Sequence, residues 1–139
     1  MLVYICCAGG ATSSLFCSKI KKASKENTIL VDDIMTIISN FKEYNERYKF
    51  ILAYGPAEFI KESSIKEYNL NNIIDLILIC PQVRYLLSSI KKLISPYNIN
   101  CDVLDMKTFG TMNGEKALKD IMKYAAGLNG KVASPPVNV

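Results

Sequence analysis

The residue best placed for chemistry in this sequence is a cysteine that ends an apolar run. The run is Leu2–Cys6, Cys7 follows it, and the next seven residues are small or carry hydroxyl groups. We expect a strand that ends at the thiol and a helix that starts within the small residues. Backbone N–H groups and the positive end of the helix then face the sulfur, and such surroundings stabilise a thiolate and hold a phosphoryl group. The expected phosphoryl-binding residues are Ala8, Gly9, Gly10, Ala11, Thr12, Ser13 and Ser14.

Two neighbouring cysteines compete for this role. Alternation along a strand sends Cys6 and Cys7 to opposite faces of the sheet. With Cys7 as the last residue before the loop, Thr12 to Ser14 fall at the helix start, where their hydroxyls can cap the helix and bind an anion. With Cys6 the pattern is one residue out of step, so we favour Cys7 as the nucleophile. Three cysteines lie in strand or helix patterns without such a loop and are expected in the core: Cys17, Cys80 and Cys101.

The cysteine count and the absence of histidine exclude several kinds of catalytic and structural site. The chain has five cysteines, an odd number with no Cys-x-x-Cys pair, and it has no histidine. This combination argues against a disulfide framework, a zinc site and catalysis by a histidine of this chain, and it is typical of a reducing cytoplasm. We therefore expect no metal and no cofactor. The nucleophile must be activated by backbone dipoles or by a partner protein.

Charge and hydropathy argue against a nucleic-acid-binding, membrane-spanning or secreted protein. The net charge is +4, carried mainly by lysines spread along the chain, with Arg47 and Arg84 as the two arginines. A dispersed lysine surplus is typical of a solvated surface, and no basic patch interleaved with aromatic residues indicates nucleic-acid binding. No apolar stretch approaches the roughly 18 residues of a membrane span, and the N-terminus lacks the basic flank of a signal peptide. We expect a cytoplasmic protein that does not insert into the membrane.

The order of apolar runs predicts an α/β fold. Short β-branched runs alternate with helical patterns, which is typical of a three-layer sandwich: a parallel sheet with helices on both faces. With 139 residues the chain is most simply one domain, over residues 1–127, while residues 128–139 are expected to form a disordered tail. The clear strands are Leu2–Cys6, Phe50–Tyr54, Leu76–Ile79 and Asp102–Met106, and Thr28–Val31 is a candidate fifth strand.

Helical stripes fill the intervals between these strands. Apolar residues recur at helical spacing over Val83–Ile94 and over Ile34–Tyr48. Asp32 and Asp33 are placed to favour the N-terminus of the second stripe. Further helices are expected over Ala57–Tyr68 and from about Asn113 onwards.

The cysteine loop resembles that of the low-molecular-weight phosphatases, which also use a cysteine nucleophile. Those enzymes clamp phosphate with an arginine in the loop and protonate the leaving group with an aspartic acid. The corresponding position here, six residues after Cys7, is Ser13, and Arg84 could contribute only from another loop. Without the bidentate guanidinium the transition state loses a strong anchor. A phosphocysteine that resists water and waits for another acceptor is the expected product.

Three segments together resemble the IIB component of the lactose/cellobiose (N,N′-diacetylchitobiose) group of bacterial sugar phosphotransferase systems. They are the cysteine loop through Lys19, the segment Cys80–Tyr85 and the segment Val103–Gly114, and the resemblance extends from Val3 to about Tyr124. The family pattern is a cysteine, two small residues, a glycine, hydroxyl residues, an aliphatic pair and Ser-Lys-Met. The resemblance implies a low-molecular-weight-phosphatase-like sheet of four strands in the order 2-1-3-4, or of five in the order 2-1-3-4-5.

The resemblance also implies a function and partners. Cys7 would accept a phosphoryl group from a phosphohistidine of the IIA protein. It would donate that group to a β-linked disaccharide, of the cellobiose, chitobiose or lactose class, held by the membrane-embedded IIC component. The protein would then be a phosphotransferase, a monomer that meets the inner face of the membrane through IIC. The alternatives are a phosphatase-like enzyme that needs no partner and a regulatory module that responds to phosphorylation.

The chain departs from the family between Lys19 and Pro81, where it is longer by about one strand–helix unit. This departure leaves the number of strands open, and also which loop lies beside the cysteine. The candidate residues are Gly55 and Pro56 in one loop, and Pro81, Gln82 and Arg84 in the other.

Overall fold

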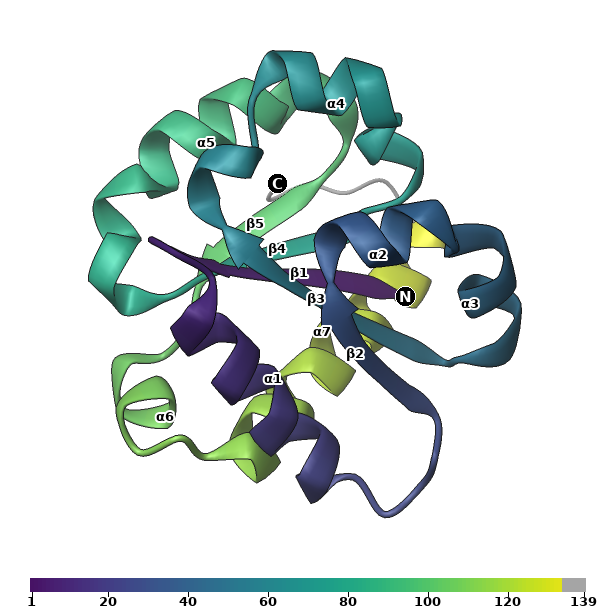
Figure 1. Ribbon diagram of the computed structural model, residues 1–139, viewed down its shortest axis with the longest axis vertical. Helices are drawn as coiled ribbons and strands as arrows, with labels where there is room; N and C mark the ends of the chain where they lie inside the picture. Colours follow the sequence, from purple (N-terminus) through teal and green to yellow (C-terminus); the bar gives the residue numbers. More distant parts are fainter. Residues whose placement is uncertain (134–139) are drawn as a thin grey trace.

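Five parallel strands form the centre of the protein (Figure 1). The computed structural model describes residues 1–133. For residues 128–133 it describes only that they belong to a helix. The strands are β1 (Leu2–Cys7), β2 (Ile29–Asp33), β3 (Phe50–Pro56), β4 (Leu76–Ile79) and β5 (Asn100–Val103). Their order in the sheet is β2-β3-β1-β4-β5. The strand that carries the two neighbouring cysteines is therefore the central one.

The predicted α/β class and parallel sheet are confirmed, and so is the relative order of the four clear strands, which are β3, β1, β4 and β5 across the sheet. The candidate fifth strand also forms, but as an edge strand beyond β3, which makes the order in chain numbering 2-3-1-4-5 and not 2-1-3-4-5. The physical reason lies in its composition. Four of the five residues of β2 are only half-buried, Asp32 and Asp33 among them, whereas a place beside β1 requires burial on both faces.

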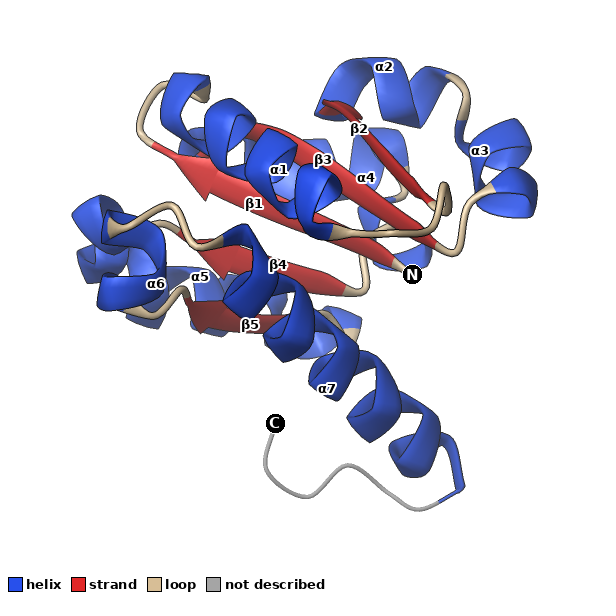
Figure 2. Cartoon of the chain, turned by 90° about the horizontal axis from the view of Figure 1, so that it is seen from below, coloured by secondary structure: helices blue, strands red, loops and turns tan. Residues whose placement is uncertain are grey.

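Helices cover both faces of the sheet (Figures 1 and 2). One face carries α1 (Ala11–Ala23), α6 (Met106–Gly110) and α7 (Gly114–Ala133). The other carries α2 (Ile34–Ser39), α3 (Phe41–Arg47), α4 (Glu62–Tyr68) and α5 (Leu87–Ile94). Short 3-10 helices connect these elements at Ala57–Phe59, Leu70–Asn72, Pro81–Leu86 and Ser95–Tyr97.

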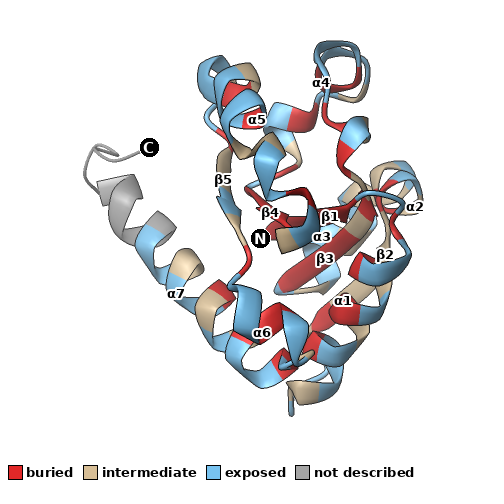
Figure 3. Ribbon diagram, turned by 90° about the vertical axis from the view of Figure 1, so that its left-hand side faces the viewer, coloured by how far each residue is buried: buried red, intermediate tan, exposed pale blue. Residues whose placement is uncertain are grey.

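The alternation of β1 divides the interior into two cores. Val3, Ile5 and Cys7 face α1, α6 and α7, while Tyr4 and Cys6 face the other helical layer. All six residues of β1 are buried, as expected for a strand covered on both faces (Figure 3). The two neighbouring cysteines therefore lie in different cores, as the alternation predicts.

Several element boundaries differ from the predicted ones because local capping decides them. The stripe over Ile34–Tyr48 is broken at Asn40 into α2 and α3. Its N-terminus is capped by Asp33, which accepts a hydrogen bond from the Thr36 N–H at 3.0 Å. The strand expected over Asp102–Met106 ends early because Asp105 caps α6. The helix expected from Val83 begins as a 3-10 turn.

The C-terminal boundary also differs. We expected the folded part to end near residue 127, and the structure assigns α7 as far as Ala133. The rest of the expected tail, residues 134–139, lies outside the described residues. Over the part of the chain that the structure describes, no helix combines the length and the apolar character needed to cross a bilayer.

Two glycines mark close approaches between elements. A Cβ atom on Gly114 at the start of α7 would lie 2.2 Å from the carbonyl oxygen of Lys19 in α1, so these helices pack backbone against backbone. A Cβ atom on Gly55 in β3 would lie 2.5 Å from the hydroxyl oxygen of Tyr4. That hydroxyl donates to the carbonyl of Pro56 at 2.6 Å, which ties the end of β3 to the central strand.

Candidate functional site

The candidate site lies where the central strand ends. Cys7 is the last residue of β1, and only 5% of the surface of this residue is exposed. In the neighbouring strand β3, Cys7 pairs with Pro56, and on the other side the N–H of Cys80 donates to the carbonyl of Cys6 at 2.9 Å. The carboxyl edge of a parallel sheet is where ligands of such folds bind, and Cys7 lies at the middle of that edge.

The loop after Cys7 turns back toward the sulfur. Gly10 has a φ of 90°, a left-handed conformation that favours glycine, and its N–H donates to the Cys7 Sγ at 3.0 Å. Its backbone also passes close to β3, because a Cβ atom on Gly10 would lie 3.4 Å from backbone atoms of Gly55. The turn that directs an N–H at the sulfur thus depends on glycine for its left-handed conformation.

Ser13 provides the second polar contact. Its Oγ lies 3.4 Å from the Cys7 Sγ, where it accepts from the thiol, and it donates to the carbonyl of Gly10 at 3.0 Å. Ser13 is completely buried, so its hydroxyl can form hydrogen bonds only with groups of the protein. When the thiol ionises, the sulfur can only accept, and rotation of the Ser13 O–H turns this hydroxyl into a donor to the thiolate.

The polar contacts set the acidity of the site. Burial raises the pKa of the Cys7 thiol, but the hydrogen bonds from the Ser13 hydroxyl and from the backbone N–H groups of Ser13, Gly10 and Gly9 outweigh it. The net effect is a pKa below the ordinary value of a cysteine. A larger fraction of Cys7 is therefore ionised at neutral pH than of a free thiol, and the thiolate is the nucleophile.

Replacing the buried serine should make the thiol less acidic. In Ser13→Ala the thiolate loses one donor, so the pKa of Cys7 rises and its alkylation by iodoacetamide at pH 7 slows several-fold. The measurement is the alkylation rate of the Cys7 peptide against pH. The neighbouring Ser14→Ala is the control. An unchanged midpoint in Ser13→Ala would show that this hydroxyl does not stabilise the thiolate.

The hydroxyls at the helix start act differently from the prediction. The N-cap of α1 is Gly10, and no side chain caps the helix, so the expectation that Thr12 to Ser14 cap it is wrong. Ser13 is buried against the sulfur, while Thr12 is exposed. A helix start without a capping side chain leaves its first N–H groups free to bind an anion. Ala8, Gly9 and Ala11 are also exposed around this position.

Both candidate loops lie beside the cysteine, because β1 has a neighbour on each side. Gly55 and Pro56 belong to the end of β3, and Pro81 directly follows Cys80 at the end of β4. Arg84 and Gln82 are exposed on the 3-10 turn after β4, anchored by the buried Val83. The question that the sequence left open thus has a single geometric answer: one loop on each side.

The other cysteines lack this environment. Burial, followed by neighbouring thiols, raises the pKa of Cys6 and of Cys17, and both side chains are completely buried. Burial also raises the pKa of Cys101 in β5 to about 12. Among the described residues no group of three cysteine, aspartate or glutamate side chains is arranged to hold a metal ion.

Sequence reasoning missed a set of exposed apolar side chains at the same edge. Each follows the end of a strand: one on α1 after β1, one on α2 after β2, one after β4 and one at the start of α6 after β5. We call them the apolar rim; Tyr85 is the most exposed, at 75%. Large apolar residues within the first eight positions after a strand end were the signal that could have identified them. The apolar rim consists of Leu15, Met35, Tyr85 and Met106.

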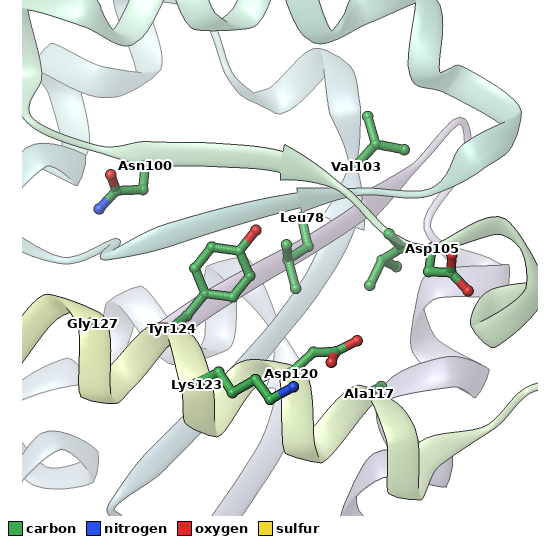
Figure 4. A pocket seen from close by; sticks show the side chains of 10 residues that line it. Leu78, Asn100, Val103, Asp105, Ala117, Asp120, Lys123, Tyr124 and Gly127 are labelled. Carbon is green, nitrogen blue, oxygen red and sulfur yellow. The ribbon is translucent and has the colours of Figure 1, made fainter. Parts of the chain in front are cut away.

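A hollow of about 650 Å³ lies elsewhere, between α7 and the strands β4 and β5 (Figure 4). Leu78 and Ala117 contribute to its lining, and the ring of Tyr124 lies across it. The Tyr124 hydroxyl donates to Asp102, and Asp120 pairs with Lys116, so these polar groups already have partners within the chain. The hollow does not include Cys7 or its loop.

Comparisons with known proteins bear on the fold alone. No protein-family model matches the sequence, and no curated protein matches it. Among solved structures, the chain is similar to a solution NMR structure of a de novo designed PLOOP2X3_50 fold protein. The two share 13% sequence identity over 88% of this chain and 91% of that one, with a TM-score of 0.58.

Proposed function

We propose that this protein is a phosphocarrier of a sugar phosphotransferase system. Cys7 accepts a phosphoryl group from a phosphohistidine of a IIA protein and donates it to a β-linked disaccharide held by a membrane IIC component. The observation that supports this most is the thiol at the carboxyl end of the central strand, hydrogen-bonded by the Gly10 N–H, with a pKa below the ordinary value. The resemblance of the cysteine loop and of the segments after β4 and β5 to IIB components gives the class of reaction.

The chemistry consists of two displacements at phosphorus. In the first, the Cys7 thiolate forms an S–P bond while the N–P bond of the phosphohistidine breaks, and the electron pair returns to the partner's imidazole. In the second, a sugar hydroxyl forms an O–P bond while the S–P bond breaks; the hydroxyl proton leaves to the solvent and the thiolate is restored. Between the two steps the N–H groups of the loop and of the first turn of α1 bind the phosphoryl oxygens.

The apolar rim supports a carrier that meets other proteins. Large exposed apolar side chains that surround a reactive group are typical of a protein-docking face. Tyr85 comes from the segment after β4, which is next to the thiol, and Met106 from the segment after β5, one strand further out, so the partner would contact the carboxyl edge of the sheet. Arg84 adds a positive charge on one of these segments, which suits a partner that carries a phosphoryl group.

The test is transfer from a IIA protein of a lactose/cellobiose-type phosphotransferase system. Incubation with that protein, phosphorylated on its histidine, should add the mass of one phosphoryl group to this chain, and peptide mapping should place it on Cys7. Addition of the sugar with membranes that contain IIC should then remove it. No transfer from a phosphorylated IIA partner would contradict the proposal and favour the regulatory or phosphatase alternative.

The site should be a poor phosphatase. Because Ser13 stands where a phosphatase loop has its arginine, we expect hydrolysis of p-nitrophenyl phosphate to stay at the level of the Cys7→Ser variant. The measurement is release of p-nitrophenol without any protein partner. Turnover that is clearly above background and is lost in Cys7→Ser would favour the phosphatase alternative instead.

A further inference from the structure

A second thiol that phosphoryl transfer does not use lies next to the nucleophile. Cys6 pairs with Ile79 across β1 and β4, so Cys7 and Cys80 are the next residues of two adjacent strands in the same register. The Cys80 N–H donates to the Cys6 carbonyl at 2.9 Å, which extends the strand pairing to this point. Both side chains belong to the core under α1 and α7, so the two thiols lie on the same face of the sheet.

The spacing of the two cysteines suits a disulfide. Neighbouring strands lie about 4.8 Å apart, and disulfides join Cα atoms that are roughly 4.4–6.8 Å apart. Cys7 ends β1 and Cys80 lies just beyond the end of β4, so the backbone at both positions can adjust without loss of internal strand pairing. The other thiols are placed less well: Cys6 faces the opposite core, and Cys17 lies on α1.

The two thiols differ in ionisation, and this difference decides which of them an oxidant attacks first. Burial, and then the neighbouring Cys7 sulfur, raises the pKa of Cys80 to about 12, so Cys80 is a protonated thiol at neutral pH. The pKa of Cys7 is below the ordinary value, so Cys7 is the group that oxidants reach as a thiolate. Cys80 is fully buried, and its one route to reaction is through a group that forms inside the protein, such as an oxidised Cys7.

We propose that Cys7 and Cys80 form a redox pair that switches the carrier off under peroxide stress and protects its nucleophile. The Cys7 thiolate attacks one oxygen of hydrogen peroxide, the O–O bond breaks, and Cys7 becomes a sulfenic acid with release of hydroxide. The Cys80 sulfur then attacks the Cys7 sulfur and the S–O bond breaks; the departing hydroxide takes the Cys80 proton and leaves as water as the disulfide forms. A cellular dithiol reduces the disulfide by exchange and restores the thiolate.

This inference rests on the proposed function, because it is a regulation of the phosphoryl-accepting sulfur. A disulfide occupies that sulfur, so the oxidised protein cannot accept a phosphoryl group. Trapping as a disulfide also prevents further oxidation to a sulfinic acid, which dithiols do not reverse. Without Cys80 the sulfenic acid of Cys7 has no thiol in position to form a disulfide, and further peroxide oxidises it irreversibly to the sulfinic acid.

The experiment uses the full chain alone, reduced and then treated with a small excess of hydrogen peroxide at pH 7. The oxidised protein should lose the mass of two hydrogen atoms, and alkylation after unfolding should label three of its five cysteines. Peptide mapping should join the Cys7 peptide to the Cys80 peptide. Cys80→Ala and Cys80→Ser should abolish this link and accumulate the sulfinic acid of Cys7, whereas Cys17→Ala should retain the link.

Phosphoryl acceptance provides the functional readout. After peroxide it should fall below about one tenth of its initial value, and dithiothreitol should restore it in the original chain but not in the Cys80 variants. A link from Cys7 to Cys17, or a sulfinic acid at Cys7 without any link in the original chain, would overturn the inference. The mass measurement needs no IIA protein, so a link that forms in a chain that accepts no phosphoryl group would contradict the proposed function alone.

Discussion

Replacing the Cys7 sulfur by oxygen should abolish phosphoryl acceptance. In Cys7→Ser the group at the end of β1 is a hydroxyl, whose pKa lies far above that of a thiol, and the N–H donors of the loop cannot ionise it at neutral pH. We expect the rate of phosphoryl transfer from the IIA protein to fall by at least ~10³-fold. Intact mass after timed incubation with the phosphorylated partner measures this effect.

The neighbouring cysteine provides the matched control. Cys6→Ser makes the same atomic change one residue earlier, in the opposite core, where the side chain is completely buried. It should lower stability, since a hydroxyl replaces a thiol among apolar groups, but should leave a phosphorylatable Cys7. Acceptance that survives Cys7→Ser and disappears in Cys6→Ser would show that the nucleophile is one residue earlier than we place it.

A methyl group at the start of α7 should destabilise the whole protein. In Gly114→Ala the new Cβ atom would lie 2.2 Å from the Lys19 carbonyl oxygen and 2.8 Å from the Ile20 nitrogen, both backbone atoms that cannot rotate away. The two helices must separate, and overpacking of this kind costs roughly 3 kcal/mol or more in the free energy of unfolding. For a domain of this size we expect a fall in Tm of about 10 °C. Thermal unfolding followed by circular dichroism measures it.

A second glycine of the same helix separates this packing effect from helix propensity. A Cβ atom on Gly127 would have no other atom within 4 Å, so Gly127→Ala adds helix propensity without a clash. We expect it to raise the free energy of unfolding by roughly 0.5–1 kcal/mol. If both variants shifted Tm in the same direction, the close approach of α1 and α7 would not be a determinant of stability.

The position of the reactive thiol followed from the sequence because few residues determine it. A buried run that ends in cysteine and is followed by Gly9 and Gly10 specifies strand, turn and helix locally, and the alternation of Cys6 and Cys7 assigns each to a face. The contact between Ser13 and the sulfur did not follow in the same way. All of residues 12–14 carry hydroxyls, and which one turns inward depends on the rotation of α1 against the sheet.

The arrangement of the remaining elements depended on contacts between distant segments. Thr28–Val31 reads as a strand, but its place beside β3 is decided by pairing with Phe50–Pro56, which the local pattern does not encode. The apolar spacing over Ile34–Tyr48 is continuous, yet the helix is interrupted at Asn40. The spacing could not predict this break, since it shows which face of a helix is buried and not where the helix ends. The apolar rim was missed for a related reason: its members come together only once the order of the strands is known.

The position of β2 has a consequence for how partners are distinguished. β2 lies at the edge of the sheet and pairs with β3, not with β1, so this strand and the helices after it extend the sheet without pairing with the thiol-bearing strand. Met35, on the helix that follows β2, widens the footprint available to an incoming protein beyond what four strands provide. We expect this outer module to set which donor is recognised, while the chemistry at the centre stays common to any donor.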